Sequence, residues 1–375
     1  MNAGAVSRAI REGTNHIATA QRMLPLVSIL IPAYNSEAWI ADTLQSALAQ
    51  TWPRTEIIIV DDGSTDQTLQ IAKRFVSAKV SVSSQLNQGA ATARNSALQK
   101  SQGDYIQWLD ADDLMAPDKI ARQMNVALDC SGKRTLLSGE WGYFLFRPQK
   151  AKWAASPLNC ELSAVEWLLR KMEQRAFVQT SSWLVSRELT EAAGPWNTQL
   201  TADDDGEYFS RVILASDVIR FVPGARIFYR IAGSGSLSYL GRNKRKLESQ
   251  FRSMELQISH LRMREESERV RSACLKFLQD ALLYFYPEQP ELVKRCEEIA
   301  ASLGHRLSVP QMPRKYAWIQ RRFGWRVAKA SQLYYNKVKL SFQRSLDWAL
   351  FRLEKQASKW SADDAQPHGK LSTHR

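Results

Sequence analysis

The 375-residue sequence has few cysteines and no long apolar run. Its four cysteines lie far apart and form no CxxC pair, so the pattern of a disulfide framework or a structural zinc site is missing. Such cysteine usage is typical of the reducing cytosol. No stretch approaches the roughly 20 apolar residues of a membrane-spanning helix. Residues 1–24 lack the apolar centre of a signal peptide, and we expect a polar leader there.

Common cofactor-binding patterns are missing as well. No GxGxxG follows the first apolar run, which argues against an ordinary dinucleotide-binding enzyme. The phosphate loop GxxxxGKS/T does not occur either, which argues against a kinase or ATPase of that type. The five histidines are scattered, so a histidine-based metal site is not expected.

Acidic residues are scarce only toward the C-terminus. Residues 1–240 hold 24 Lys/Arg and 24 Asp/Glu, whereas residues 241–375 hold 27 and 14, so the whole net charge of +13 lies in the C-terminal part. The length suggests two or three domains of about 100–200 residues each. A neutral front half followed by a basic region predicts two separate tasks.

The front half alternates apolar runs with helical patterns. Four runs are typical of buried strands: 27–32, 56–61, 80–84 and 105–109. Apolar spacing predicts helices over 37–50 and 90–99, and Ser64 with Gln67 resembles a capping box that starts another helix. This alternation predicts an α/β fold with a mostly parallel sheet and flanking helices. Ligands of such sheets bind beyond the carboxyl ends of the strands, where polar residues gather in this sequence.

Acidic residues follow two of the predicted strands. Asp110 and Asp112 would bring two carboxylates to the mouth of the sheet, and such ligands suit Mg²⁺ or Mn²⁺ that also holds substrate phosphates. Taken alone, the pair is more typical of an acidic turn leading into a helix. The stretch 61–66 has a similar alternative, because acidic residues at a helix start complement the macrodipole.

Five motifs occur in one order along the front half. They are Tyr34-Asn35, the acidic stretch 61–66, Asn87-Gln-Gly89, Ala93-Arg94-Asn95 and the acidic turn 110–113. This order resembles the family 2 glycosyltransferases, whose nucleotide-binding half has the Rossmann-like GT-A fold. The phrases IPAYNSE, IIIVDDGSTDQT, NQGAATARNSAL and GDYIQWLDADD match the family pattern. The resemblance is strong over 25–118, is traceable to 238, and does not cover the last third.

The resemblance implies a site for a nucleotide-sugar donor, with UDP as the expected nucleotide. Ala33 and Tyr34 would line the base pocket, with the ring of Tyr34 against the uracil face. Asp61 would accept a hydrogen bond from the base, and Arg94 would lie near the base and the phosphates.

The resemblance also implies a metal-binding DXD motif. Asp110 would hold the ribose or the metal shell, and Ala111 would contact the nucleotide. Asp112 would be the main protein ligand of Mg²⁺ or Mn²⁺. Such an ion neutralises the charge that develops on a departing diphosphate.

Members of this family invert the anomeric carbon and need a carboxylate base for the acceptor hydroxyl. The best match is the acidic cluster 203–207 ahead of a predicted helix over 208–214. Aligned on that helix, Asp205 takes the position of the base, and Asp204 is the alternative. Three aspartates in a row are also typical of a helix N-cap cluster.

Two further predictions concern the acceptor and the diphosphate. Trp183 and Trp196 would stack on an acceptor sugar, although buried core positions are equally typical of tryptophan. Many relatives carry a histidine after the last strand, and this sequence has none there. We expect Arg230 and the Ser/Gly-rich loop 233–238 to hold the diphosphate instead.

The basic region is helical in pattern. From residue 243, one predicted helical face holds Leu247, Phe251, Met254, Ile258 and Leu261. A last long helix is predicted over 316–360, and residues 306–359 hold 13 Lys/Arg and two Asp/Glu. A basic helix with aromatic residues on one face is typical of contact with an anionic membrane surface. The alternatives are packing on the catalytic domain and binding of an anionic glycan. No nucleic-acid partner is expected, because no known binding motif accompanies the charge.

Together these features predict four segments: a polar leader 1–24, a GT-A domain 25–240, a basic helical region 241–360 and a disordered tail 361–375. We expect an inverting, metal-dependent glycosyltransferase that moves one sugar to a glycan or lipid-linked acceptor in cell-surface polysaccharide synthesis. It would be cytoplasmic or peripheral on the cytoplasmic face of the membrane. The alternative function is a non-catalytic nucleotide-sugar sensor or scaffold at the membrane.

Overall fold

The computed structural model describes residues 24–130, 134–153, 155–231 and 243–363, with side chains up to residue 355. The predicted leader 1–24 and tail 361–375 lie almost entirely outside these residues. So does the predicted loop 233–238. Those three predictions therefore stay predictions.

The first sheet contains all four predicted strands. Its order is β3-β2-β1-β4-β8, and only β8 is antiparallel to its neighbour. The strands are β1 (Val27–Ala33), β2 (Thr55–Asp61), β3 (Val80–Ser84), β4 (Tyr105–Trp108) and β8 (Val185–Ser186). Ala33 lies opposite Asp61 in the register of β1 and β2. The carboxyl ends of these two strands therefore meet at one edge.

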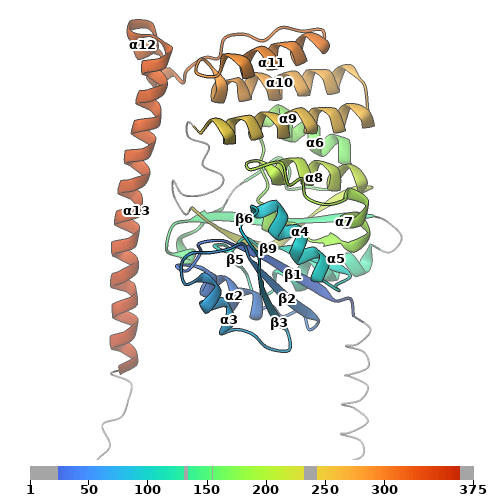
Figure 1. Ribbon diagram of the computed structural model, residues 1–375, viewed down its shortest axis with the longest axis vertical. Coiled ribbons are helices and arrows are strands. Elements are labelled where there is room, and N and C mark those ends of the chain that lie inside the picture. Colours follow the sequence, from blue (N-terminus) through green and yellow to red (C-terminus); the bar gives the residue numbers. More distant parts are fainter. Residues whose placement is uncertain (1–23, 131–133, 154, 232–242, 364–375) are drawn as a thin grey trace, which may run out of the picture.

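Helices cover both faces of this sheet (Figure 1). They are α2 (Ile40–Leu48), α3 (Thr68–Lys73), α4 (Ala90–Lys100) and α5 (Lys119–Asp129). Side chains alternate along β1, so Leu30 packs with the alanines of α4, whereas Ile29 and Ile31 pack with α2 and α5. The apolar run predicted from the sequence is thus a strand buried on both sides.

The predicted capping box is wrong. Ser64 Oγ accepts a hydrogen bond from the Asn35 N–H at 3.0 Å, well ahead of α3. The helix begins at Thr68, and Asp66 Oδ1 accepts the Thr68 N–H at 2.9 Å. The predicted helix 37–50 exists but is shorter, because residues before Ile40 form a turn.

A second sheet, ordered β5-β9-β6-β7, extends the fold. Its strands are β5 (Leu114–Met115), β6 (Thr135–Phe144), β7 (Lys152–Trp153) and β9 (Val218–Arg230). Two short 3₁₀ turns, Pro148–Lys150 and Thr180–Ser182, and the helices α6 (Ala164–Gln174), α7 (Arg187–Ala193) and α8 (Asp204–Ala215) complete this part. Leu114 pairs with Phe228, which brings the end of β9 next to the acidic turn 110–113.

Three C-terminal helices stack on this part of the molecule (Figure 1). They are α9 (Lys244–Arg264), α10 (Glu268–Phe285) and α11 (Pro290–Ser302). The five apolar residues predicted to share a face of α9 are all buried, which confirms that prediction. One continuous core joins Leu30 of β1 to Leu303 after α11. These helices are therefore packed on the α/β part and share its core.

The predicted single helix over 316–360 is wrong. Two helices, α12 (Arg314–Phe323) and α13 (Trp325–Asp363), meet at Gly324, whose φ of +83° favours glycine. The buried Tyr316 of α12 packs with Ala328 of α13. Figure 1 shows α13 running along one side of the molecule. Among the described residues, no helix combines the length and apolarity needed to cross a membrane.

Candidate active site

The predicted base-binding residues lie where β1 and β2 end. Ala33 is buried, whereas the side chain of Tyr34 is 49% exposed. Asp61 is buried, and its Oδ2 accepts hydrogen bonds from the Ser64 N–H and the Ser84 hydroxyl, both at 3.2 Å. Its Oδ1 has no hydrogen-bond donor within the described part of the chain. Burying a carboxylate oxygen without a hydrogen-bond donor costs free energy. This atom is therefore a candidate acceptor for a donor group of a ligand.

The next aspartate has a structural task. Asp62 accepts the N–H groups of Gln88 (3.0 Å) and Gly89 (2.8 Å) and the side-chain amide of Gln85 (2.8 Å). These bonds fix the loop ahead of α4, which begins at Ala90. Arg94 is thereby held on the first turns of α4, pointing toward the acidic turn.

Arg94 is the centre of the site. Its guanidinium donates to Asp110 Oδ1 at 3.0 Å and to Asp204 Oδ2 at 2.6 Å, and its side chain is only 6% exposed. Burial alone would lower the pKa of Arg94, but the charges of Asp204 and Asp110 outweigh it and raise the pKa. The guanidinium also lies 4.4 Å from the ring centre of Trp196. The structure thus joins the acidic turn to the acidic cluster 203–205 through one cation.

The acidic turn holds two kinds of carboxylate. Asp113 is fully buried and accepts hydrogen bonds from Gln179 Nε2 (2.6 Å) and the Arg230 N–H (3.0 Å). Asp112 differs, because no hydrogen bond or ion pair from another described side chain reaches its carboxylate. Burial and the nearby charge of Asp110 raise the pKa of Asp112 to about 7.

Arg230 supports this turn from behind. It is 3% exposed, its Nε donates to the Asp112 carbonyl at 2.8 Å, and its guanidinium lies over Trp39 at 4.3 Å. Burial lowers the pKa of Arg230, although neighbouring carboxylates act against this. In this structure the Nε atom of Arg230 binds the protein backbone. Its predicted role in holding a diphosphate remains a prediction.

Asp204 and Asp205 have different partners. Asp204 is occupied by Arg94. Asp205 accepts the Thr180 hydroxyl at 3.0 Å and the Gly206 N–H at 2.9 Å, both uncharged donors. Of the two predicted candidates for a base, Asp205 is therefore the one whose carboxylate is not tied to a cation.

The prediction that Trp183 and Trp196 stack on a sugar is wrong. Each is only 1% exposed. The Trp196 ring stacks on Tyr208 with centroids 4.0 Å apart, and Trp183 stacks on Phe209 at 5.3 Å. Both rings are core packing behind the acidic cluster, where no sugar reaches them.

Sequence reasoning missed the turn Thr180–Ser182 and the residue before it. Gln179 Nε2 contacts Asp113 and lies 3.5 Å from Asp110 Oδ2, while the adjacent Thr180 contacts Asp205. These two residues connect the acidic turn with the candidate base. Nothing in their local sequence marks them, because their role comes from residues about 65 positions upstream and 25 downstream.

The carboxylates suffice for part of a metal site only. Within the described residues, no three Asp, Glu, His or Cys side chains gather to hold an ion by themselves. The remaining ligands of an ion at Asp110 and Asp112 would come from substrate phosphates and water, as is usual for Mg²⁺.

The front part of this chain is similar in sequence to known proteins. Residues 28–131 match the sequence profile described as "Glycosyl transferase family 2". The putative teichuronic acid biosynthesis glycosyltransferase TuaG of Bacillus subtilis is 42% identical over 110 residues, which cover 28% of this chain and 44% of that protein. Chondroitin synthase of Escherichia coli is 45% identical over 105 residues, covering 28% and 15%. The chain thus spans less than half the length of these curated relatives.

Similar solved structures extend the comparison to the fold. The structure of S. aureus TarS residues 1–349 in complex with UDP-GlcNAc superimposes with a TM-score of 0.61 at 18% identity, covering 74% of this chain and 81% of that one. The UDP complex gives a TM-score of 0.54 at 18% identity, covering 82% and 91%. The two sheets with flanking helices and a helical C-terminal part are GT-A-like, and residues 28–131 match glycosyl transferase family 2.

Proposed function

We propose that this chain transfers a single sugar from a nucleotide sugar to a hydroxyl group of a glycan or lipid-linked acceptor. The observation that carries the proposal is the position of Arg94 between Asp110 and Asp204, with Asp112 and Asp205 beside them and not tied to a cation. A donor site, a phosphate site and a base thereby adjoin one another at the carboxyl edge of the sheet.

The donor base would bind where β1 and β2 end. The Asp61 Oδ1 atom, which has no donor among the described residues, would accept the imide N–H of uracil. The half-exposed ring of Tyr34 would stack on the base, and Ala33 would close the pocket from below. Uridine is the first base to test, because the TarS structures that share this fold hold UDP-GlcNAc and UDP.

Asp110 and Asp112 fit a hard divalent cation. Asp112 has a carboxylate without a side-chain partner in the described part of the chain, and Asp110 keeps Oδ2 apart from Arg94. Mg²⁺ or Mn²⁺ bound there would neutralise the charge of the leaving diphosphate. The backbone of Ala111 holds the two aspartates in place, since its carbonyl accepts the Thr43 hydroxyl at 3.0 Å.

Asp205 is the proposed base. It would take the proton of the acceptor hydroxyl while that oxygen bonds to the anomeric carbon and the nucleoside diphosphate leaves with the bonding electrons. A single displacement of this kind inverts the anomeric centre. Asp204 is unsuited to this role because its ion pair with Arg94 occupies Oδ2.

The proposed setting is polysaccharide synthesis at the cell surface, on the cytoplasmic side. TuaG and chondroitin synthase, named for such polymers, support the setting. The four cysteines are free thiols, as in proteins of a reducing compartment. We further propose the division of the chain into a GT-A part over 25–240 and a basic helical part over 241–360.

Calorimetry of UDP binding with and without Mn²⁺ tests the donor site. We expect binding that depends on the metal and is lost in Asp112→Ala. Asp118→Ala is the matched control, because the side chain of this aspartate is about half exposed and its one ion pair among the described residues is with Arg122. Loss of binding in both variants, or no metal-dependent binding of any nucleoside diphosphate to the wild type, would refute the proposal.

Turnover of UDP-sugars separates the two candidate bases. Asp205→Asn should keep UDP affinity but lower kcat by about 10²–10⁴-fold, as expected for loss of a general base. Asp204→Asn should weaken the Arg94 cluster and keep more activity than Asp205→Asn. The reverse order of activities would make Asp204 the base.

A further inference from the structure

Helix α13 has one face that holds it to the rest of the protein. Asp347 accepts hydrogen bonds from Arg147 Nε (2.8 Å) and the Phe146 N–H (3.0 Å), and Glu354 accepts from Arg147 Nη1 at 2.7 Å. Asp347, Phe351 and Glu354 lie four and three residues apart, so they share one side of the helix. Phe351 adds a ring contact with Phe146 at 6.4 Å.

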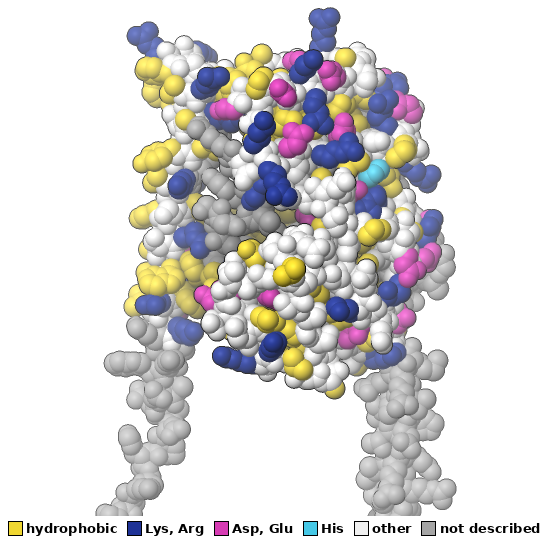
Figure 2. Space-filling view, in the orientation of Figure 1, with side chains coloured by type: hydrophobic (Ala, Val, Ile, Leu, Met, Phe, Trp, Pro, Cys, Tyr) yellow, Lys and Arg dark blue, Asp and Glu magenta, His cyan; other side chains and the backbone are white. Residues whose placement is uncertain are grey.

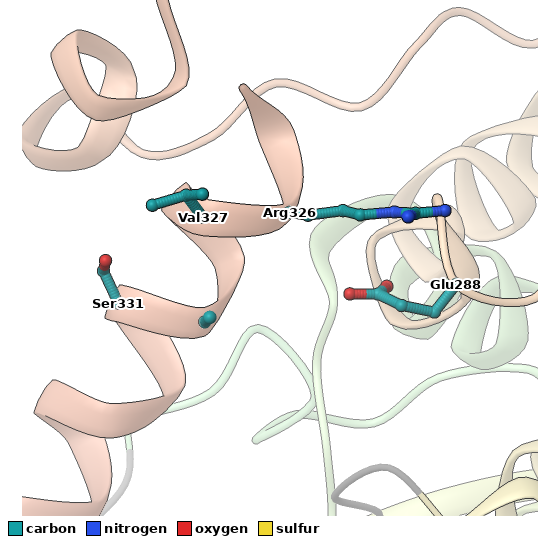
Figure 3. A pocket seen from close by; sticks show the side chains of 5 residues that line it. Glu288, Arg326, Val327 and Ser331 are labelled. Carbon is teal, nitrogen blue, oxygen red and sulfur yellow. The ribbon is translucent and has the colours of Figure 1, made fainter. Parts of the chain in front are cut away.

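The other end of α13 is held in a similar way. Lys329 Nζ donates to Glu288 Oε2 at 2.8 Å and to the carbonyl of Tyr286 at 2.8 Å. Figure 3 shows Arg326 extending from α13 toward Glu288, whereas Val327 points to the other side of the helix. Contacts near both ends thus hold α13 to the rest of the protein and set its orientation relative to the active site.

The opposite side of α13 carries an exposed apolar stripe. Its members are Val327, Tyr334, Val338, Phe342, Leu346 and Leu353, each between 47% and 72% exposed. They follow one another at steps of four or seven residues, so they line one face. We call this set the outer stripe. Figure 2 shows hydrophobic side chains along the outer edge of this helix, with Lys and Arg between them.

Charge beside the outer stripe has one sign. Residues 314–355 hold 11 Lys/Arg and two Asp/Glu. Both acidic residues, Asp347 and Glu354, are used in the contacts with Arg147 on the inner face. Lys337, Lys339 and Arg352 are exposed and flank the stripe. An approaching surface therefore meets apolar side chains and cations.

We propose that the outer stripe of α13 docks on an anionic phospholipid surface. A helix with an apolar face rimmed by Lys and Arg lies in the plane of such a surface, with aromatic residues at the headgroup level. Trp348 and Tyr335, which are 44% and 51% exposed, supply further aromatic groups beside the stripe. Because the charged side chains beside the outer stripe are Lys and Arg, the surface that binds there should be anionic.

A left-handed coiled coil with a second copy of the chain would need apolar residues at alternating steps of three and four. Phe342, Leu346 and Leu353 fit such steps, with Ala349 between the last two. In such a dimer, however, the flanking Lys and Arg side chains would face the same cations of the other copy, and like charges repel. The charge beside the stripe therefore favours an anionic surface as the occupant.

Flotation of the full chain with vesicles tests the proposal. We expect binding to phosphatidylcholine vesicles that contain phosphatidylglycerol, and weak binding to pure phosphatidylcholine or in high salt. Phe342→Ser/Leu346→Ser should lower the bound fraction about tenfold or more, because it removes apolar contact with the bilayer. Its matched control is Met263→Ser/Val76→Ser, two side chains 75% and 58% exposed elsewhere, which should bind as the wild type does.

Other outcomes would overturn the proposal. One is equal flotation of the wild type and the Phe342→Ser/Leu346→Ser variant while circular dichroism shows both folded. Another is a dimer, seen by light scattering, that this variant converts to a monomer without any change in flotation. A third is binding to pure phosphatidylcholine that salt does not weaken, which would contradict the anionic occupant. None of these results depends on transferase activity.

Discussion

Gly206 offers a sharp test of how the acidic cluster is built. It lies in the first turn of α8, where replacing glycine by alanine would ordinarily stabilise a helix by about 1 kcal/mol. At this position, however, a Cβ atom would lie 2.5 Å from Oδ1 and 2.8 Å from Cγ of Asp203. The Asp203 carboxylate is held in place because its Oδ2 accepts hydrogen bonds from Ser253 Oγ (2.7 Å) and Gln257 Nε2 (2.9 Å), both on α9.

The packing effect should outweigh the helix propensity. A hydrogen bond to a charged group contributes about 1.5–3 kcal/mol, so displacing this carboxylate from both partners would cost about 3–6 kcal/mol. After subtraction of the alanine gain, Gly206→Ala should lower the free energy of unfolding by about 2–5 kcal/mol. Urea denaturation followed by tryptophan fluorescence measures this difference.

A double-mutant cycle identifies the cause. Asp203→Gly removes the carboxylate, and glycine suits the φ of +55° at this residue. In the Asp203→Gly background, Gly206→Ala should be neutral or stabilise the protein by up to about 1 kcal/mol. An equal loss of stability in both backgrounds would refute the contact argument. So would a gain of stability in the otherwise wild-type protein.

Three further predictions concern the same cluster. Burial, followed by the charge of Asp205, raises the pKa of Asp203 to about 6. Protonated Asp203 therefore stabilises the folded protein below about pH 4, and this contribution is lost as the pH rises through 6. Because asparagine does not ionise, the free energy of unfolding of Asp203→Asn, measured by urea denaturation, should rise relative to that of the wild type by up to about 3 kcal/mol between these pH values. Arg94→Met should destabilise the protein by about 3–5 kcal/mol, since it leaves two carboxylates without their cation, and a second change, Asp204→Asn, should restore part of this loss in the same assay. Thr180→Val should lower kcat about tenfold with an unchanged donor KM, because it removes the hydroxyl that orients Asp205, and steady-state kinetics would contradict this if only KM changed.

The sheet was predictable because each of its main strands is a short, continuous apolar run in the sequence. Val27 to Pro32 and Glu56 to Asp61 consist largely of β-branched or apolar residues buried on both faces, and this pattern has few other structural solutions. The order of polar residues after those runs also indicated the edge where the site lies. Residue pairs that are far apart in sequence were harder. Nothing local shows that Arg94 pairs with Asp204, 110 positions later.

The errors have physical causes of the same kind. Sequence spacing could not separate a tryptophan that packs on Tyr208 from one that meets a sugar, because both positions need an aromatic side chain. The helical period continues across Gly324, so it concealed the turn between α12 and α13. Composition alone could not show that the two acidic residues of α13, Asp347 and Glu354, face inward.

The two proposals meet at the segment that follows β6. Phe146 contacts Phe351 of α13 on one side and Trp39 on the other, with ring centroids 5.8 Å apart in the second pair. Trp39 lies under the guanidinium of Arg230, which holds the Asp112 carbonyl. A continuous set of contacts therefore runs from the helix proposed to lie on the membrane to the turn proposed to hold the metal ion. A bilayer on the outer stripe would therefore fix the distance between its surface and this turn.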